Sequence, residues 1–180
     1  LNAIFEYLGA LIEIKEKKLN LNLTKVEKYL GSSSGGILSF FLCIGIDPHK
    51  ILELMKLLPY SKMSKMDSKK YLYLFDTLGI EDTNLFKKIF KSVLEYKNIK
   101  SNITFKELYE ITNKDLSLIT YCLNSKELKL LNHIFTPKLE VVHGLCMTIA
   151  IPILFKPVSY ENRLYIDPCV TCNFPIDYIT

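Results

Sequence analysis

The sequence predicts a three-layer α/β/α fold, in which a central mixed, largely parallel sheet carries helices on both faces. Strand-like and helix-like runs alternate along the chain, which is typical of layered α/β domains. Residues 37–44 form an apolar run after a Gly/Ser-rich turn, and this run predicts a helix in the protein centre. With 180 residues, 49% of them hydrophobic, the chain is long enough for one domain with a substantial core.

The first third of the chain is predicted to hold three helices and one strand. Apolar residues recur at helical spacing over residues 1–15 and predict the first helix. Residues 25–30 predict a strand that leads into the Gly/Ser-rich turn, and the central helix follows over about residues 34–46. Asp47 and Pro48 then provide an N-cap and a first-turn proline, so the third helix begins there.

The middle of the chain is less regular. Residues 60–70 are polar and predict a surface loop, whereas the apolar residues 71–78 are ambiguous. Residues 81–83 cap a helix that has a broad apolar face, and residues 98–102 end it.

The next segment is predicted to form a short helix and two strands. Thr104 and Glu107 have the spacing of a capping box, which marks the start of the helix. Residues 116–123 and 129–135 predict strands that are joined by a turn at 124–126.

The last part of the chain is predicted to bring an acidic residue to the end of a strand. Thr136 and Pro137 repeat the cap-plus-proline signal, so a helix should begin there and run to about residue 146. Residues 163–166 predict a final short strand, and Asp167 follows at its carboxyl end.

Charge and cysteine content exclude several classes of protein. The net charge is only +4 and the lysines are scattered, so no nucleic-acid partner is expected. The apolar runs are too short or too interrupted to span a bilayer, and no secretory signal is present, which predicts a soluble protein with at most peripheral membrane contact. Five scattered cysteines form no disulfide framework and predict a reducing, cytoplasmic location.

A zinc site is the less favoured interpretation of the cysteines. Cys169 and Cys172 form a lone C-x-x-C pattern, and its further ligands, His143 and Cys146, would have to come from another element. Unpaired core cysteines are the commoner case, so we predict no metal and no cofactor.

The most informative motif is Gly31-Ser32-Ser33-Ser34-Gly35, which matches G-x-S-x-G between a strand and a helix. A sharp turn of this kind lifts one serine clear of the backbone, and the small residues Gly31 and Gly35 let the turn close. Ser33 is the lifted residue, and N–H groups near Ser34 lie where they can stabilise an oxyanion. A Gly/Ser-rich stretch is more often a plain loop, but the buried helix behind it favours a catalytic serine.

A serine hydroxyl needs a neighbouring base to become a good nucleophile. His49 and His143 fall in predicted helices and His133 in a predicted strand, so a surface or packing role is favoured for each. Asp167 follows a strand directly. Because ligands gather at the carboxyl ends of strands in such sheets, we expect Ser33 and Asp167 to meet there.

Three stretches together resemble the patatin-like phospholipases, a family of lipid acyl hydrolases with a Ser-Asp dyad. Residues 29–37, with the Gly-Ile-Asp-Pro that follows, look like the family's elbow. Residues 104–108 and the strand around 119–120 look like its middle section. Residues 149–158, with the run that ends at Asp167, are similar to the segment that leads to its catalytic aspartate. The resemblance covers nearly the whole chain in the right order.

Two features depart from the family pattern. The family's aspartate is normally followed by glycine, whereas Pro168 and Cys169 follow Asp167, and proline fixes φ at about −65°. The family's glycine-rich oxyanion loop would fall before Leu1. We therefore expect a single patatin-like domain over residues 1–180 that lacks its N-terminal strand and this loop.

The resemblance implies a phospholipase A-type enzyme that cleaves fatty-acyl esters of phospholipids or other lipids at membrane surfaces. Ser33 would attack the ester carbonyl and Asp167 would accept its proton directly. Gly31, Ser34 and Gly35 would form the elbow and the oxyanion site, and no metal is required.

Two alternatives stay open. One is a catalytically impaired patatin-like domain that binds lipid or a partner protein. The other is an esterase that uses Ser33 with His133 or His143.

Overall fold

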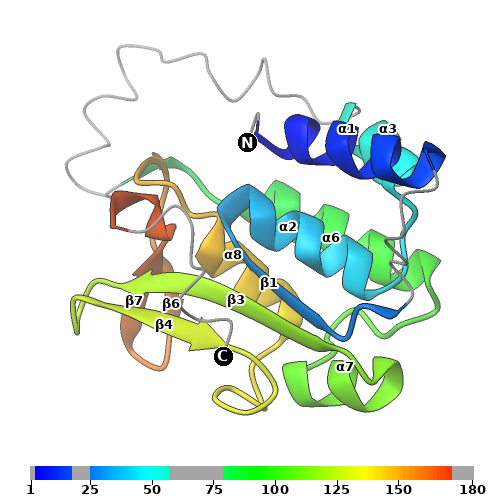
Figure 1. Ribbon diagram of the computed structural model, residues 1–180. Coiled ribbons are helices and arrows are strands. Elements are labelled where there is room, and N and C mark those ends of the chain that lie inside the picture. Colours follow the sequence, from blue (N-terminus) through cyan, green and yellow to red (C-terminus); the bar gives the residue numbers. More distant parts are fainter. Residues whose placement is uncertain (1–2, 18–24, 57–78, 172–180) are drawn as a thin grey trace.

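The structure, a computed structural model, describes residues 3–17, 25–56 and 79–171. Helices and strands alternate in it, as the sequence predicts (Figure 1). In chain order the elements are α1 (Ala3–Glu16), β1 (Lys28–Ser32), α2 (Ser33–Cys43), α3 (Pro48–Lys56), β2 (Gly79–Glu81), α6 (Asn84–Tyr96), α7 (Phe105–Thr112), β3 (Asp115–Cys122), β4 (Glu127–Leu131), α8 (Val141–Thr148), β5 (Ile153–Phe155), β6 (Val158–Tyr160), β7 (Arg163–Ile166) and the 3₁₀ turn η2 (Pro168–Val170).

Strand β3 is the centre of the main sheet and has partners along both of its edges. β1 runs parallel to the first half of β3, with Ser32 opposite Ile119. β7 runs antiparallel to the end of β3, with Ile166 opposite Tyr121. β4 pairs with residues 118–122 of β3, a stretch that overlaps the pairings of both β1 and β7. β4 must therefore lie on the edge of β3 opposite to β1 and β7. β1 and β7 therefore share one edge of β3, and their carboxyl ends point at each other.

The fold is the expected α/β arrangement of a mixed sheet with flanking helices. Among the described strands of the main sheet only β1 and β3 are parallel, whereas the pairings of β3 with β4, β3 with β7 and β6 with β7 are antiparallel. The sheet is thus less parallel than the sequence predicted. The parallel pair of β2 and β5 forms a separate small sheet.

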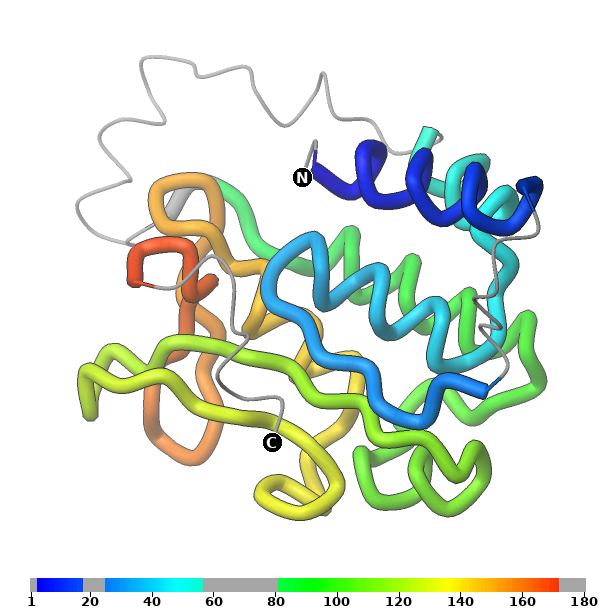
Figure 2. The backbone as a smooth tube through the Cα atoms, in the orientation of Figure 1, coloured from blue at the N-terminus to red at the C-terminus, as the bar shows by residue number. Residues whose placement is uncertain are grey.

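Helix α2 lies at the centre of the helical layer. Figures 1 and 2 show α2, α6 and α8 on the same side of the main sheet, with α1 and α3 beyond α2. Phe40 and Phe41 of α2 are fully buried and pack on Phe90 of α6, at ring-centroid distances of 5.9 Å and 6.3 Å. Burying each such side chain contributes about 1.5–3 kcal/mol, so the core holds α2 firmly behind the G-x-S-x-G turn.

Local signals predicted the ends of several elements correctly. At the start of α3, Oδ1 of Asp47 accepts a hydrogen bond from the N–H of His49 at 3.0 Å. The capping box of α7 is confirmed, because Thr104 Oγ1 accepts from the Glu107 N–H at 3.3 Å and Glu107 Oε2 accepts from the Thr104 N–H at 2.8 Å. β7 has the predicted bounds. The predictions for residues 60–70 and 71–78 fall outside the described residues.

The strand predicted over residues 129–135 is wrong in extent. β4 ends at Leu131, because the buried Asn132 starts a turn in which its Oδ1 accepts from the N–H groups of Ile134 and Phe135 at 3.0 Å and 2.9 Å. His133 therefore lies in a turn and not in a strand.

The helix predicted to begin at Thr136 and Pro137 begins later, at Val141. The N–H of Thr136 donates back to the carbonyl of Asn132 at 2.9 Å, and Glu140 forms an isolated β-bridge with Thr104. These contacts hold the chain outside the helix until Val141, four positions after Pro137.

Candidate active site

The turn between β1 and α2 has the backbone of a nucleophile elbow. Strand β1 ends at Ser32, helix α2 begins at Ser33, and Ser33 has φ of 52°. A left-handed φ is uncommon in a non-glycine residue, and such strained residues cluster at functional sites. Ser33 is therefore held in the conformation that a strand-to-helix turn requires to present one side chain.

The two glycines of the motif have different roles. A Cβ on Gly31 would lie 2.4 Å from the carbonyl carbon and oxygen of Gly35 and 2.6 Å from the nitrogen of Gly36, so the turn closes only with glycine at position 31. A Cβ on Gly35 would meet nothing within 4 Å. Ser34, the expected oxyanion residue, is buried in the first turn of α2.

The backbone of Ser33 is tied to a distant element. Its N–H donates to Oγ1 of Thr148, the last residue of α8, at 3.0 Å. Thr148 Oγ1 in turn donates to the carbonyl of Ile119 in β3. The N–H of Ser33 is thus occupied within the protein.

Asp167 reaches the elbow because of the sheet register. β1 and β7 approach each other along the same edge of β3, and Ser33 and Asp167 are the residues that follow their carboxyl ends. The Asp167 N–H donates to the carbonyl of Ala150 at 2.9 Å, which fixes the backbone there. Ser33 and Asp167 thus come together because the carboxyl ends of β1 and β7 face each other along β3. The sequence predicted instead that they meet at the carboxyl ends of neighbouring parallel strands.

The carboxyl group of Asp167 is buried and incompletely bonded. Its residue exposure is 0%, Oδ1 accepts from the Cys169 N–H at 2.9 Å, and Oδ2 has no hydrogen-bond partner among the described residues. Burial raises the pKa of Asp167, and the Ser33 hydroxyl and Cys169 lower it in part. The Ser33 hydroxyl therefore lies near enough to the carboxyl group to act on this pKa.

Pro168 fits the turn that follows Asp167. It occupies the first position of η2, and Asp167 is the N-cap of that turn. A first helical position needs no N–H and has a φ that suits proline, so the departure from glycine is accommodated here.

None of the three histidines is paired with Ser33. His133 Nδ1 lies 3.2 Å from Asp115 Oδ1, and the imidazole stacks on Tyr109 at 3.9 Å between ring centroids. His143 Nε2 lies 3.0 Å from the carbonyl of Ser159, and His49 Nε2 lies 3.6 Å from a carboxylate oxygen of Glu16.

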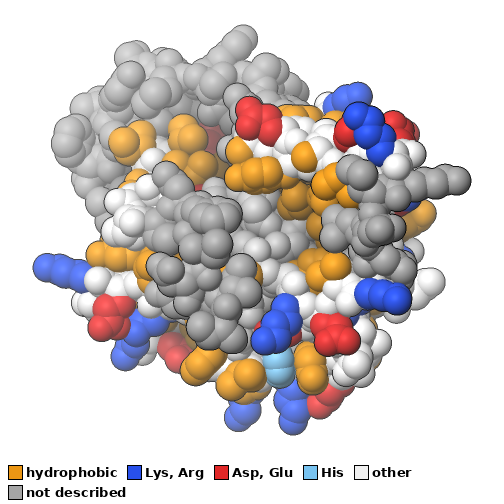
Figure 3. Space-filling view, in the orientation of Figure 1, with side chains coloured by type: hydrophobic (Ala, Val, Ile, Leu, Met, Phe, Trp, Pro, Cys, Tyr) orange, Lys and Arg blue, Asp and Glu red, His pale blue; other side chains and the backbone are white. Residues whose placement is uncertain are grey.

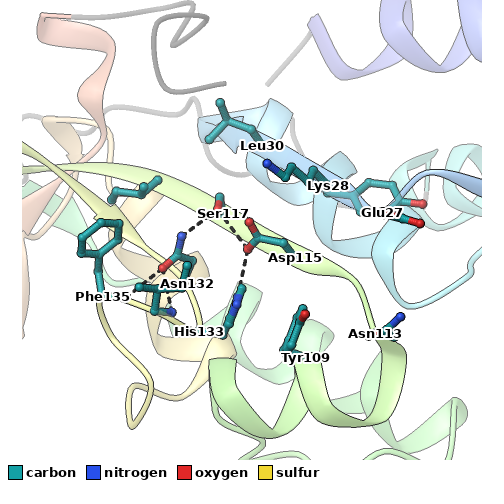
Figure 4. Close-up of a pocket in the computed structure, with 13 residues that line it drawn as sticks. Glu27, Lys28, Leu30, Tyr109, Asn113, Asp115, Ser117, Asn132, His133 and Phe135 are labelled. Carbon is teal, nitrogen blue, oxygen red and sulfur yellow. Dashed lines mark hydrogen bonds and ion pairs between the residues drawn. The ribbon is translucent and has the colours of Figure 1, made fainter. Parts of the chain in front are cut away.

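A pocket of about 540 Å³ lies at the opposite end of β1 and β3 from Ser33. Figure 4 shows Asp115 and Ser117 of β3 directed towards Asn132 and His133 in this pocket. Ser117 Oγ donates to Asp115 and accepts from Asn132 Nδ2, so the polar groups of the pocket bond one another.

The described residues contain no group of three or more His, Cys, Asp or Glu side chains that could hold a metal ion. Cys172, one half of the C-x-x-C pattern, lies outside them. No helix among the described residues is both long and apolar enough to cross a bilayer. On the face seen in Figure 3, basic and acidic side chains are intermingled.

The sequence interpretation missed two buried threonines. Thr148 contacts the elbow as described, and Thr120 of β3 donates to the carbonyl of Ile166, the residue before Asp167, at 2.9 Å. No sequence motif marks either threonine, since the residues that each one contacts are distant in the chain.

Three comparisons with known proteins bear on this arrangement. The family model described as Patatin-like phospholipase matches residues 5–179. A protein of Invertebrate iridescent virus 6 named "Probable lipid hydrolase 463L" is 34% identical over 163 residues, which make up 88% of this chain and 55% of that protein. The crystal structure of VipD from Legionella pneumophila shares the fold with a TM-score of 0.64 and 15% identity, over 94% of this chain and 44% of that chain.

The chain thus spans about half the length of the viral relative and of VipD. The family match nonetheless extends over almost all of this chain, from before the elbow to beyond Asp167. The chain therefore belongs to the patatin-like phospholipase family.

Proposed function

We propose that this chain carries the catalytic residues of a phospholipase A-type lipid acyl hydrolase, with Ser33 as the nucleophile and Asp167 as its base. The observation that carries the proposal is the left-handed backbone of Ser33 beside a fully buried carboxyl group. Strain of this kind persists only where the surrounding structure enforces it. Membership of the family and the likeness to a lipid hydrolase support the same chemistry.

In the first half of the reaction, Oγ of Ser33 forms a bond to the carbonyl carbon of the ester while its proton passes to Oδ2 of Asp167. The carbonyl oxygen becomes an oxyanion. First-turn N–H groups of a helix have no partner four residues back, and the Ser33 N–H is already bound, so we assign the Ser34 N–H as the donor for this oxyanion. The bond to the leaving alcohol then breaks, and Asp167 returns the proton to the alcohol oxygen.

In the second half, water attacks the acyl group on Ser33 and gives its proton to Asp167. The intermediate collapses, the fatty acid leaves, and Asp167 returns the proton to Ser33 Oγ. The same carboxyl group thus acts as base and as acid in each half, as in other covalent hydrolases.

The surroundings of Asp167 suit it to this role. An aspartate in water is a weak base, and burial makes the charged form less stable, so the raised pKa of Asp167 improves its ability to take a proton. The hydrogen bond from the Cys169 N–H holds Oδ1, which leaves the unpartnered Oδ2 for the hydroxyl of Ser33.

Two substitutions test this proposal. Ser33→Ala and Asp167→Asn should each lower fatty-acid release from phosphatidylcholine vesicles by about a thousandfold or more. The first removes the nucleophile and the second the base, and no other group of the site can replace either one. Ser33→Ala should also abolish covalent labelling by a fluorophosphonate probe.

Ser32→Ala is the matched control. Ser32 is the neighbouring elbow serine, and its side chain forms no capping hydrogen bond, so its loss should change the hydrolysis rate by no more than about threefold. If the wild-type protein binds vesicles but neither releases fatty acid nor reacts with the probe, it is a lipid-binding member of the family and the proposal fails.

A further inference from the structure

Thr148 holds the strained residue of the elbow. Its side chain is fully buried at the end of α8, where Oγ1 accepts the Ser33 N–H at 3.0 Å and donates to the carbonyl of Ile119 in β3. Its methyl group lies against α2, since a Cβ on Gly36 would be 3.1 Å from Thr148 Cγ2. One side chain therefore joins the elbow, the central strand and α8.

Thr120 makes the corresponding contacts on the aspartate side. It is also fully buried, and its Oγ1 lies 2.9 Å from the carbonyl of Ile166 and 3.3 Å from the carbonyl of Met147. Ile166 is the last residue of β7, so this bond fixes the backbone directly before Asp167.

The two threonines form a reciprocal unit. Thr148 Oγ1 donates to the carbonyl of Ile119, the residue before Thr120, and Thr120 Oγ1 lies 3.3 Å from the carbonyl of Met147, the residue before Thr148. Thr148 Oγ1 also accepts from the Ser33 N–H, whereas the single hydroxyl proton of Thr120 is shared between two carbonyls, with the shorter contact to Ile166 at 2.9 Å and the longer to Met147 at 3.3 Å. The side chains of Thr148 and Thr120 thus contact the backbone on the two sides of the site.

We propose that Thr120 and Thr148, the threonine pair, are positioning residues that set how Ser33 Oγ lies relative to the Asp167 carboxyl group. This inference rests on the proposed function of Ser33 and Asp167. Packing alone does not account for threonine at these two positions, because valine has nearly the same shape and carries no hydroxyl that must find a partner when it is buried. Both hydroxyls lie in the buried interior, where they bond the chain on both sides of the site.

The test compares hydroxyl loss with hydroxyl retention. Thr148→Val and Thr120→Val should each lower kcat by about tenfold to a hundredfold, since a shift of about 1 Å between reacting groups has an effect of this size. KM for 4-nitrophenyl butyrate should change by no more than about twofold, because both side chains are fully buried and offer no surface to a substrate. Thr148→Ser and Thr120→Ser keep the hydroxyl and should restore most of the rate.

Thr112→Val is the matched control. Thr112 Oγ1 also joins a helix carbonyl to a backbone N–H, with 2.7 Å to the Leu108 carbonyl and 3.2 Å from the Lys114 N–H, but at the end of α7 and away from Ser33. Its loss should leave kcat unchanged while it costs the same kind of hydrogen bonds.

Three results would overturn the inference. The first is a folded Thr148→Val protein with wild-type kcat and wild-type fluorophosphonate labelling. The second is a rate loss in the serine variants equal to that in the valine variants, which indicates packing and not positioning. The third is an inert wild-type protein, which removes the proposed function itself. If a valine variant fails to unfold cooperatively, the serine variants and the labelling rate of the other valine variant decide.

Discussion

Oδ1 of Asp167 accepts a hydrogen bond from the backbone N–H of Cys169 at 2.9 Å, which makes Asp167 the N-cap of the turn that Pro168 begins. The bond holds one carboxylate oxygen and leaves the other, Oδ2, buried without a partner among the described residues. A buried acceptor that lacks a partner destabilises the folded state. The carboxyl group of Asp167 is therefore expected to lower the stability of the folded protein, which is common for groups that serve catalysis.

Asp167→Asn should stabilise the protein at neutral pH although it removes activity. Asparagine keeps an oxygen for the Cys169 N–H and carries no charge, so the free energy of unfolding should rise by on the order of 1 kcal/mol. The measurement is urea unfolding of the wild type and the variant from pH 4 to pH 8.

The pH dependence of that difference has a defined sign. Burial raises the pKa of Asp167 in the folded state above its ordinary value, so the wild type loses stability as pH rises through the folded pKa. The gain from Asp167→Asn should therefore be largest at pH 8 and shrink as pH falls towards the unfolded pKa. A gain that grows as pH falls would contradict it.

Gly31→Ala should destabilise the elbow strongly. The added Cβ would meet the backbone of Gly35 at 2.4 Å, and a backbone neighbour cannot turn away as a side chain can. We expect a loss of at least about 2 kcal/mol in the free energy of unfolding, measured by urea titration. Gly35→Ala is the control, because the space beside Gly35 is open, and it should cost nothing or stabilise by up to about 1 kcal/mol.

The elbow and the end of β7 were predictable because their signals are local. A strand run, a G-x-S-x-G turn and a buried helix follow one another within the chain, and Asp167 follows a four-residue strand whose bounds were predicted correctly. The capping box of Thr104 and Glu107 is local in the same way. Such motifs depend on neighbours a few residues apart, so one sequence suffices to recognise them.

The remaining features depend on contacts between distant residues. The hydroxyls of Thr120 and Thr148 meet carbonyls on other elements, and nothing near either residue in the sequence marks this. The strand predicted through His133 failed because the Asn132 side chain bonds the following N–H groups, an alternative to the ladder that hydrophobic alternation does not reveal. The antiparallel pairing of β7 with β3 likewise depends on how distant parts of the chain are arranged, so the sequence of β7 alone does not indicate it.

Substituting Ile153 and Val170 together by serine should weaken action on lipid vesicles. Both side chains are 53% exposed, and both lie on segments that adjoin Asp167, one after Ala150, which bonds the Asp167 N–H, and one in η2. If a lipid surface meets this end of the protein, loss of the two apolar side chains should lower vesicle hydrolysis by about tenfold or more.

The control for this experiment lies at the other end of the sheet. Ile134 and Phe135 are 65% and 68% exposed and line the pocket remote from Ser33, so their double serine variant should hydrolyse vesicles normally. Hydrolysis of 4-nitrophenyl butyrate, which needs no membrane surface, should be unchanged in both double variants. Equal losses on vesicles from the two ends would argue against a defined membrane-facing side.

Replacing His133 and His143 together by alanine should leave catalysis intact. His133 is engaged with Asp115 and stacked on Tyr109, and His143 lies against the carbonyl of Ser159, so neither is placed to take a proton from Ser33. We expect kcat/KM for 4-nitrophenyl butyrate within about threefold of the wild type. The free energy of unfolding should fall by about 1 kcal/mol, chiefly from the lost ring stack.

Tyr109→Ala separates the two effects, because it removes the stack and keeps both histidines. It should reproduce most of the loss in the free energy of unfolding and keep full activity. Asp167→Asn should instead raise the free energy of unfolding and remove activity. A folded double histidine variant whose kcat/KM falls by a hundredfold or more would identify a Ser-His esterase. In that case the buried carboxyl group beside Ser33 would have a structural role, and its asparagine variant would retain activity.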